Sequence, residues 1–314
     1  MSQPKRIALA GGTGMLGAAV VQAILARKDL FYLTIITRSS SASKVPVSVR
    51  TIVVESYDNP ENDQALIQAL GGHDVLISTL NSAVAVELEP KLVGAAIRAG
   101  VKHFMPSEYT LDVTYPSARE LGLGNFIGAR AAWADRLAEI ASTGQITYTT
   151  LVTGGFLDFG LSTGMLGFDS TNKAARLYDH GQNAVTACTV PFIAKAVVVA
   201  LQMPVDQVEN KRINVAEVEY TGKELLQICE LVTGEHWHVE EVSTESARQK
   251  GKELLAEGNA RGAYLNFATA LNFDGCGAAN LTSGLEFGSG YGLQRRSLEE
   301  IVREAVKPFQ DSMK

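Results

Sequence analysis

A glycine-rich turn near the start of the chain has the spacing that phosphate binding requires. Gly12, Gly14 and Gly17 fit the pattern G-x-G-x-x-G, and Gly11 in place of Gly12 fits the looser G-x-x-G-x-x-G. Glycines at such positions allow a tight turn and a close approach of the backbone to a pyrophosphate, and the first amides of a following helix then face the phosphates. The turn therefore predicts a dinucleotide site, with contacts from Gly11, Thr13, Gly14, Met15, Leu16 and Gly17.

The residues after the second β-branched run indicate which dinucleotide the site prefers. An NAD site usually places Asp or Glu about twenty residues beyond the glycine turn, whereas this chain has Thr37-Arg38-Ser39-Ser40-Ser41. A guanidinium pairs with phosphate oxygens as a planar fork, and adjacent hydroxyls suit the same oxygens. We expect NADP(H) rather than NAD(H), with the 2′-phosphate held by Arg38, Ser39 and Lys44.

Strands and helices alternate through the first half of the chain, and the glycine turn lies at the first strand–helix junction. Such alternation predicts an α/β fold, a Rossmann-like doubly wound parallel sheet with its ligand crevice at the carboxyl ends of the strands. The expected strands are Lys5–Ala10, Leu33–Thr37, Arg50–Val54, Asp74–Ser78, His103–Met105 and Thr147–Val152. The expected helices are Ala18–Ala26, Asp63–Leu70, Leu88–Ala99 and Ile127–Ala141.

The segments that follow the fourth, fifth and sixth strands should lie in this crevice. Parallel strands bring their carboxyl ends to one edge of the sheet, where ligands of this fold bind. We therefore expect further contacts with the cofactor from Thr79, Leu80, Ser107, Gly155 and Phe156.

The pattern changes after Phe156, and the second half is typical of a smaller mixed α/β domain. We expect residues 1–155 to form the NADP-binding domain, rejoined by a segment around 184–218, and residues 156–314 to form mainly a substrate-binding lid. The expected strands here are Ala174–Tyr178, Ala184–Thr189, Arg212–Val218 and His236–Val242. The expected helices are Phe192–Leu201, Glu224–Val232 (opened by a capping box from Thr221 to Glu224), Glu245–Ala256, Ala263–Asn272 and Leu298–Phe309.

Composition excludes several classes of protein. A net charge of −6 argues against direct nucleic-acid binding, which needs a basic face. Cys188, Cys229 and Cys276 are few and widely spaced, so they suggest neither a disulfide framework nor a metal site. Neither a signal peptide nor an apolar run of membrane-spanning length is expected, which makes a cytoplasmic location without membrane association the default. The acidic residues concentrate between Asp206 and Glu257, where we expect a solvated outer face.

The order of these landmarks resembles the NmrA-like and isoflavone reductase-like branch of the atypical short-chain dehydrogenases, fungal members included. Besides the glycine turn and Arg38, the chain has Phe104-Met-Pro-Ser-Glu-Tyr109, where the family has Phe-x-Pro-Ser-Glu-Phe, and Gly154-Gly155-Phe156 after the sixth strand. Leu225–Trp237 resembles a late segment of fungal members. The resemblance covers essentially the whole chain. It implies NADPH bound on the sheet, an aromatic or phenolic substrate, and often a role in secondary metabolism.

One departure from the family concerns catalysis. Reductases of this family usually carry a catalytic lysine at the start of the helix after the Pro-Ser-Glu element, but this chain has no lysine between Lys102 and Lys173. Arg130 is the expected occupant of that place, with Ala129 as the alternative. Arginine can polarise a carbonyl or bind a phenolate but is a poor general acid or base. Tyr109 could donate the proton instead, or it could be a packing aromatic.

Three functions fit these observations. The first is an NADPH-dependent reductase of an aromatic or phenolic small molecule, whose substrate pocket would be lined by Phe156, Met165, Phe168, Tyr264 and Phe267. The second is an NADP(H) sensor that acts on a protein partner without turnover, and the third is an isomerase or cyclase that uses the same pocket. The absent lysine favours the second or third, and the aromatic residues of the second half favour the first or third.

Overall fold

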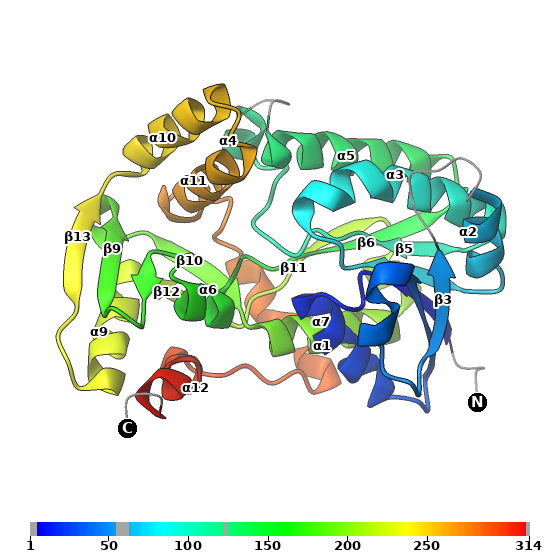
Figure 1. The fold of residues 1–314 in the computed structure, drawn as a ribbon, viewed down its shortest axis with the longest axis horizontal. Helices are drawn as coiled ribbons and strands as arrows, with labels where there is room; N and C mark the ends of the chain where they lie inside the picture. Colours follow the sequence, from blue (N-terminus) through cyan, green and yellow to red (C-terminus); the bar gives the residue numbers. More distant parts are fainter. Residues whose placement is uncertain (1–4, 55–62, 122–124, 312–314) are drawn as a thin grey trace. The chain divides into compact units, whose positions relative to one another are not determined.

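A computed structural model describes residues 5–54, 63–121 and 125–311 of the 314-residue chain (Figure 1). The chain forms two compact units, each built from three separate stretches of the sequence. Unit 1 comprises residues 1–108, 132–151 and 194–213, and unit 2 comprises residues 109–131, 152–193 and 214–314. Each unit is described by itself.

A seven-stranded sheet forms the centre of unit 1, in the order β11-β6-β5-β4-β1-β2-β3. Adjacent strands from β3 across to β6 pair in parallel, as the alternating pattern predicts for a doubly wound sheet. In this register Ala10 lies beside Ile36 on one side and Ser78 on the other. The strands are β1 (Lys5–Ala10), β2 (Phe31–Arg38), β3 (Arg50–Val54), β4 (Val75–Ser78), β5 (His103–Met105), β6 (Thr147–Val152) and β11 (Lys211–Asn214).

Helices cover both faces of this sheet, with α2, α3 and α5 on one side and α1 and α7 on the other (Figure 1). The first three bury an apolar cluster with the sheet, in which Leu92 and Leu137 pack with Leu76 and Phe104. The helices are α1 (Met15–Leu25), α2 (Asp63–Leu70), α3 (Ser82–Ala99), α5 (Phe126–Ser142), α7 (Val190–Gln202) and the short α8 (Val205–Val208), with a 3-10 turn at Ser39–Lys44.

Two predictions in this part of the chain differ most from the structure. Helix α3 begins at Ser82 rather than Leu88, because Asn81 caps it by accepting a hydrogen bond from the Val84 amide, and Pro90 lies inside the helix. The predicted strand Arg212–Val218 is two strands, β11 and β12 (Val218–Thr221), which belong to different sheets. The three residues between them, Val215–Glu217, include neither glycine nor proline and gave no turn signal in the sequence.

Unit 2 contains two three-stranded sheets, in the orders β12-β10-β7 and β13-β9-β8. The capping box at Thr221 and Glu224 is confirmed at the start of α9, and Gly234 ends this helix in the left-handed conformation. The remaining strands are β7 (Gly155–Phe156), β8 (Phe168–Asp169), β9 (Ala174–Tyr178), β10 (Ala184–Cys188) and β13 (His238–Val242). The helices are α4 (Pro116–Arg119), α6 (Leu157–Thr163), α9 (Gly222–Thr233), α10 (Thr244–Ala256), α11 (Ala260–Phe273) and α12 (Leu298–Asp311).

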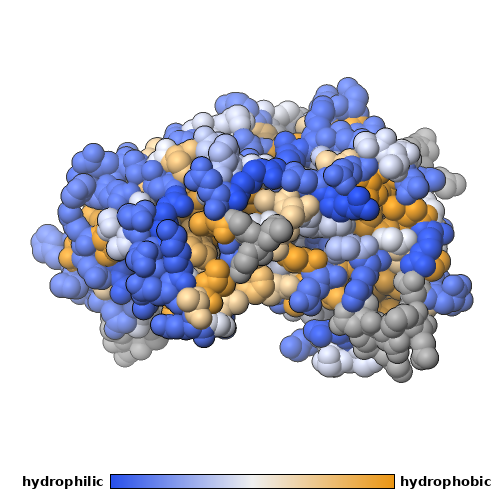
Figure 2. Space-filling view, turned by 90° about the horizontal axis from the view of Figure 1, so that it is seen from above, coloured by the Kyte–Doolittle hydropathy of each residue, from blue (hydrophilic) through white to orange (hydrophobic). Residues whose placement is uncertain are grey.

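Two apolar clusters hold unit 2 together. One joins the sheets to α9 and α12, with Trp237 and Val302 among its buried residues, and the other packs α11 against the segment that contains Leu111 and Ile127. Strand β13 is largely exposed, and the surface over β13 and α10, at the left of Figure 2, is mostly hydrophilic. The acidic segment therefore contributes to a solvated face, as expected.

Candidate functional site

The glycine turn of unit 1 is packed tightly at Gly11 and Gly17 and is open at Gly14. Gly11 has a φ of +88°, and a Cβ there would lie 2.7 Å from the Thr79 carbonyl carbon. A Cβ on Gly17 would lie 2.8 Å from Thr79 Oγ1 and closer still to the Gly11 carbonyl oxygen. A Cβ on Gly14 meets only that oxygen, at 3.4 Å, so the fold itself does not require glycine at this position.

Among the described residues, no side chain caps the start of α1. Gly14 is the N-cap residue, no side chain makes a cap hydrogen bond, and the Gly14 amide donates to the Gly11 carbonyl at 3.0 Å. Thr13 is half-buried, Met15 is exposed, and Leu16 is buried. The first amides of a helix need acceptors and favour anions, so this open turn can bind phosphate groups.

Arg38 ends β2, and Ser39 and Lys44 begin and end the 3-10 turn that follows it; all three are exposed. Since β1 and β2 run in parallel with Ala10 beside Ile36, the carboxyl end of β2 lies at the same sheet edge as the glycine turn. The residues predicted to hold a 2′-phosphate therefore belong to the edge that carries the turn.

A chain of hydrogen bonds joins Thr79, Leu80 and Ser107 at this edge. The Thr79 hydroxyl donates to the Ala10 carbonyl at 3.0 Å, next to the glycine turn. The Ser107 hydroxyl donates to the Leu80 carbonyl at 2.6 Å, and the Ser107 amide donates to the Glu89 carboxylate at 2.7 Å. These bonds fix the loops after β4 and β5 relative to each other.

Sequence reasoning missed Glu89, and it assigned Glu108 no partner. Glu108 is buried and forms an ion pair with Arg212 of β11. A signal for Glu89 exists in the sequence, because Glu89 falls in the apolar stripe of α3 with Ala85, Leu92 and Val93. A charged residue in such a stripe indicates a buried polar contact.

Both candidate catalytic residues, Tyr109 and Arg130, belong to unit 2, and each is 6% exposed. Arg130 lies on α5, four residues after Phe126, where that helix begins. A side chain turned to solvent would have excluded Arg130, and the structure places it inside the protein instead. Their catalytic roles remain predictions.

Gly155 and Phe156 form the short strand β7, which pairs in parallel with Ala187 and Cys188 of β10. Phe156 is half-buried and immediately precedes α6. Asn272 also approaches this segment: its Oδ1 would lie 3.8 Å from a Cβ on Gly155, while its Nδ2 donates to the Ala268 carbonyl at 2.7 Å. Asn272, which sequence reasoning did not select, therefore presents an acceptor beside Gly155.

The residues predicted to line a substrate pocket do not form one group. Met165 is 43% exposed, and Tyr264 is half-buried with its ring edge-on to Phe126 at 6.1 Å. Phe168 and Phe267 are 1% and 2% exposed and pack in the hydrophobic clusters, so their assignment to a pocket is corrected to core positions. Aromatic residues at helical or strand spacing serve either purpose, and burial distinguishes the two.

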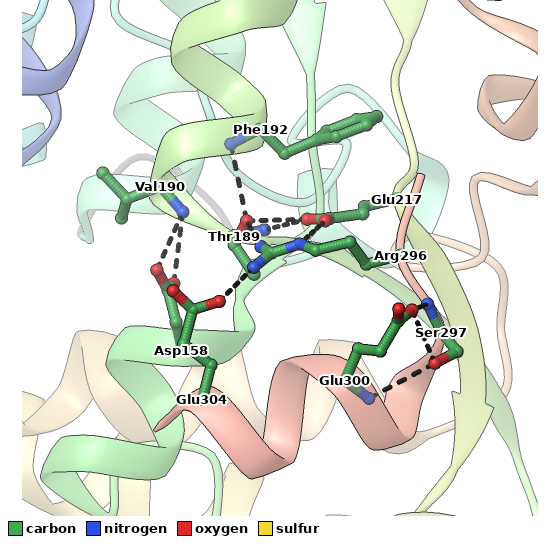
Figure 3. Close-up of polar contacts among 9 residues, drawn as sticks. All are labelled: Asp158, Thr189, Val190, Phe192, Glu217, Arg296, Ser297, Glu300 and Glu304. Atoms are coloured by element: carbon green, nitrogen blue, oxygen red, sulfur yellow. Dashed lines mark hydrogen bonds and ion pairs between the residues drawn. The ribbon is translucent and has the colours of Figure 1, made fainter. Parts of the chain in front are cut away.

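A second polar cluster of unit 2 surrounds the start of α7 (Figure 3). Glu217, 1% exposed, accepts hydrogen bonds from the Thr189 amide at 2.8 Å and the Thr189 hydroxyl at 2.7 Å, and it pairs with Arg296 at 2.8 Å. Asp158 accepts a hydrogen bond from the Val190 amide, and burial raises the pKa of its carboxyl. Burial also raises the pKa of the Cys188 thiol well above its usual value, which keeps it from acting as a nucleophile.

Within the described residues, no group of three or more His, Cys, Asp or Glu side chains could hold a metal ion. No helix in the described ranges is long and apolar enough to cross a membrane.

The sheet order and the glycine turn define a Rossmann-like α/β protein. Residues 3–128 match the model of the NmrA-like family. The chain is 32% identical over 266 residues to the isoflavone reductase homolog IRL of Zea mays. This alignment covers 80% of this chain and 82% of that protein. The chain belongs to the NmrA-like family, in its isoflavone reductase-like branch.

Other comparisons extend the match to the whole chain. The protein is 26% identical to the oxidoreductase aprR of Aspergillus flavus over 302 residues, 96% of this chain and 99% of that protein. Among solved structures, AtPrR2 with NADP+ and (+)-pinoresinol shares the fold with a TM-score of 0.75 at 20% identity, covering 98% of this chain and 100% of that one. The Aspergillus flavus relative is named an oxidoreductase and the Zea mays relative an isoflavone reductase homolog, and the chain is an oxidoreductase of this type.

Proposed function

We propose that the protein is an NADPH-dependent reductase of an aromatic or phenolic small molecule, with a role in secondary metabolism. The observation that carries the cofactor assignment is Gly14, which the fold leaves open between the tightly packed Gly11 and Gly17. An uncapped helix start at that position suits a pyrophosphate. Arg38, Ser39 and Lys44 at the end of β2 suit a 2′-phosphate.

The proposal assigns cofactor binding to unit 1, through the turn, the β2 end, and the loops that contain Thr79, Leu80 and Ser107. Gly155, Phe156, Met165 and Tyr264 belong to unit 2, and their contacts with cofactor and substrate stay predictions. The names of the relatives support this reading, since aprR is called an oxidoreductase and AtPrR2 was solved with NADP+ and an aromatic ligand.

When bound, NADPH supplies the hydride. Arg130 then stabilises negative charge that develops on a substrate carbonyl or phenol, since its guanidinium stays cationic. Tyr109 or a water molecule donates the proton, because arginine does not release one at neutral pH.

Calorimetric titration with NADPH and NADH tests the cofactor assignment, and consumption of NADPH with a panel of aromatic carbonyls and phenolic lignans tests turnover. We expect tight binding of NADPH, weaker binding of NADH, and oxidation with at least one panel compound. Equal affinity for the two cofactors would contradict the assignment.

The absence of a lysine between Lys102 and Lys173 favours a second candidate, an NADP(H)-binding protein without hydride transfer. Arg130→Lys separates the two. A reductase should tolerate or gain from this change, whereas a sensor, isomerase or cyclase binds NADPH and consumes none with either residue.

A further inference from the structure

Glu89 is a carboxylate in the interior of unit 1, with 1% of the residue exposed. Its Oε1 accepts a hydrogen bond from the Ser107 amide at 2.7 Å, and its Oε2 accepts one from the Trp133 indole N–H at 2.7 Å. Burial of a charged group is costly unless it is paired or hydrogen-bonded. An apolar residue at this place in α3 would fill the space without that cost, so packing alone does not explain a carboxylate.

The Ser107 contact connects Glu89 to the sheet edge that carries the glycine turn. The Ser107 hydroxyl donates a hydrogen bond to the Leu80 carbonyl. The residue before Leu80, Thr79, donates its hydroxyl hydrogen bond to the Ala10 carbonyl. The carboxylate thereby holds the loop after β5 by its backbone. The Trp133 contact leads in the other direction, into the apolar cluster between the sheet, α3 and α5.

We propose that Glu89 is a positioning residue for the cofactor: it holds the Ser107 backbone and, through Ser107, the loops that receive NADP(H). This inference rests on the proposed function of the same edge. The Trp133 contact contributes stability, and the Ser107 contact contributes cofactor binding.

Three variants separate these contributions, each measured by thermal unfolding, NADPH titration and the emission of bound NADPH. Glu89→Gln turns one carboxylate oxygen into an N–H₂ group that must face an N–H donor. Trp133→Phe removes the indole donor but leaves Ser107 its acceptor. Glu87→Gln makes the same chemical change at an exposed position of the same helix and is the matched control.

We expect Glu89→Gln to weaken NADPH binding about tenfold, the scale of one charge-assisted hydrogen bond, and to alter the emission of the bound nicotinamide. Trp133→Phe should lower the Tm yet keep the NADPH affinity of the unmodified protein. Glu87→Gln should change neither quantity. The proposal is overturned if Glu89→Gln binds NADPH like the unmodified protein, or if Trp133→Phe weakens binding as much as Glu89→Gln.

The double variant Glu89→Gln with Trp133→Phe covers the case in which Glu89→Gln does not fold. Without the indole donor, the amide oxygen can face Ser107 while the N–H₂ group turns away. Near-normal NADPH affinity in the double variant supports the proposal, and a tenfold loss overturns it. Failure of the proposed function looks different, because the unmodified protein and Glu87→Gln would then bind no NADPH.

Discussion

The starts of α1 and α7 present the same backbone groups and satisfy them in opposite ways. At α7, Asp158, Thr189 and Glu217 supply oxygen acceptors to the amides of Thr189, Val190 and Phe192. At α1, the N-cap is Gly14, and no side chain in the described part of the chain caps the helix. Every helix start needs acceptors for its first amides. In the proposed function, the amides at the α1 start bind the cofactor, whereas those at the α7 start are already bonded to protein side chains.

Breaking the α1 start should produce the largest effect on cofactor binding. Gly14→Val places a branched side chain where the pyrophosphate approaches, and we expect NADPH affinity to fall at least about 100-fold, or about 2.7 kcal/mol. The Tm should stay within a few degrees, because the Gly14 Cβ position is open in the fold. Calorimetric titration and thermal unfolding measure the two quantities.

Gly17→Ala is the contrasting change in the same turn. Its Cβ would press against the Gly11 carbonyl oxygen and Thr79 Oγ1, so we expect a loss of stability of about 3 kcal/mol, at the upper end for overpacking.

Normal NADPH binding by a stable Gly14→Val protein would show that the turn does not hold phosphates, and the comparison of the two helix starts would fail.

Breaking the α7 start should cost stability and leave cofactor binding intact. Glu217→Gln removes the charge that faces Arg296 and replaces one acceptor with a donor, and we expect a loss of about 2 kcal/mol in the free energy of unfolding. Chemical denaturation measures the loss, and NADPH titration should give an unchanged Kd. Glu219→Gln, at an exposed position of β12, is the matched control. A large change in Kd with little change in stability would make α7 a second ligand site.

Arg38→Ala tests the proposed contact between the end of β2 and the 2′-phosphate of NADPH. Arg38 is exposed and lies at the end of β2, so we expect a loss of about 1.5 kcal/mol, or about tenfold, in the preference for NADPH over NADH. Affinity for NADH should change little. Equal losses for both cofactors would indicate that Arg38 contacts a group that they share.

The sequence predicts one of these two helix starts well and the other hardly at all. The α1 site is local: the strand, the turn and the helix follow one another within Lys5–Leu25. The parallel, doubly wound sheet follows from the alternating pattern, but its strand order, with β11 beside β6, does not. The cluster at α7 joins Asp158, Glu217 and Arg296, which are far apart in the chain, and no periodicity reports such contacts.

The aromatic residues predicted to line the substrate pocket show the same limit of sequence-based prediction. Phe168 and Phe267 have aromatic side chains of the kind that line substrate pockets, but tertiary packing places them in the core. Glu89 could have been found, because its phase within α3 is readable in the sequence, although its partners Ser107 and Trp133 are not. Spacing predicts contacts within an element, and contacts between elements need the fold.

The smallest expected effect is a pH dependence at the α7 start. Burial, and secondarily the nearby Glu217 charge, raise the pKa of the Asp158 carboxyl from its ordinary value of 3.8. The folded state therefore holds this proton more tightly than the unfolded state, and the contribution of Asp158 to stability falls as pH rises from 3.8 through the folded pKa. Asp158→Asn cannot titrate, yet its amide oxygen can still accept from Val190. We expect its stability, relative to the unmodified protein, to increase with pH across this window when unfolding is followed by chemical denaturation. A parallel pH profile for the two proteins would show that Asp158 ionises in the folded state as it does in water.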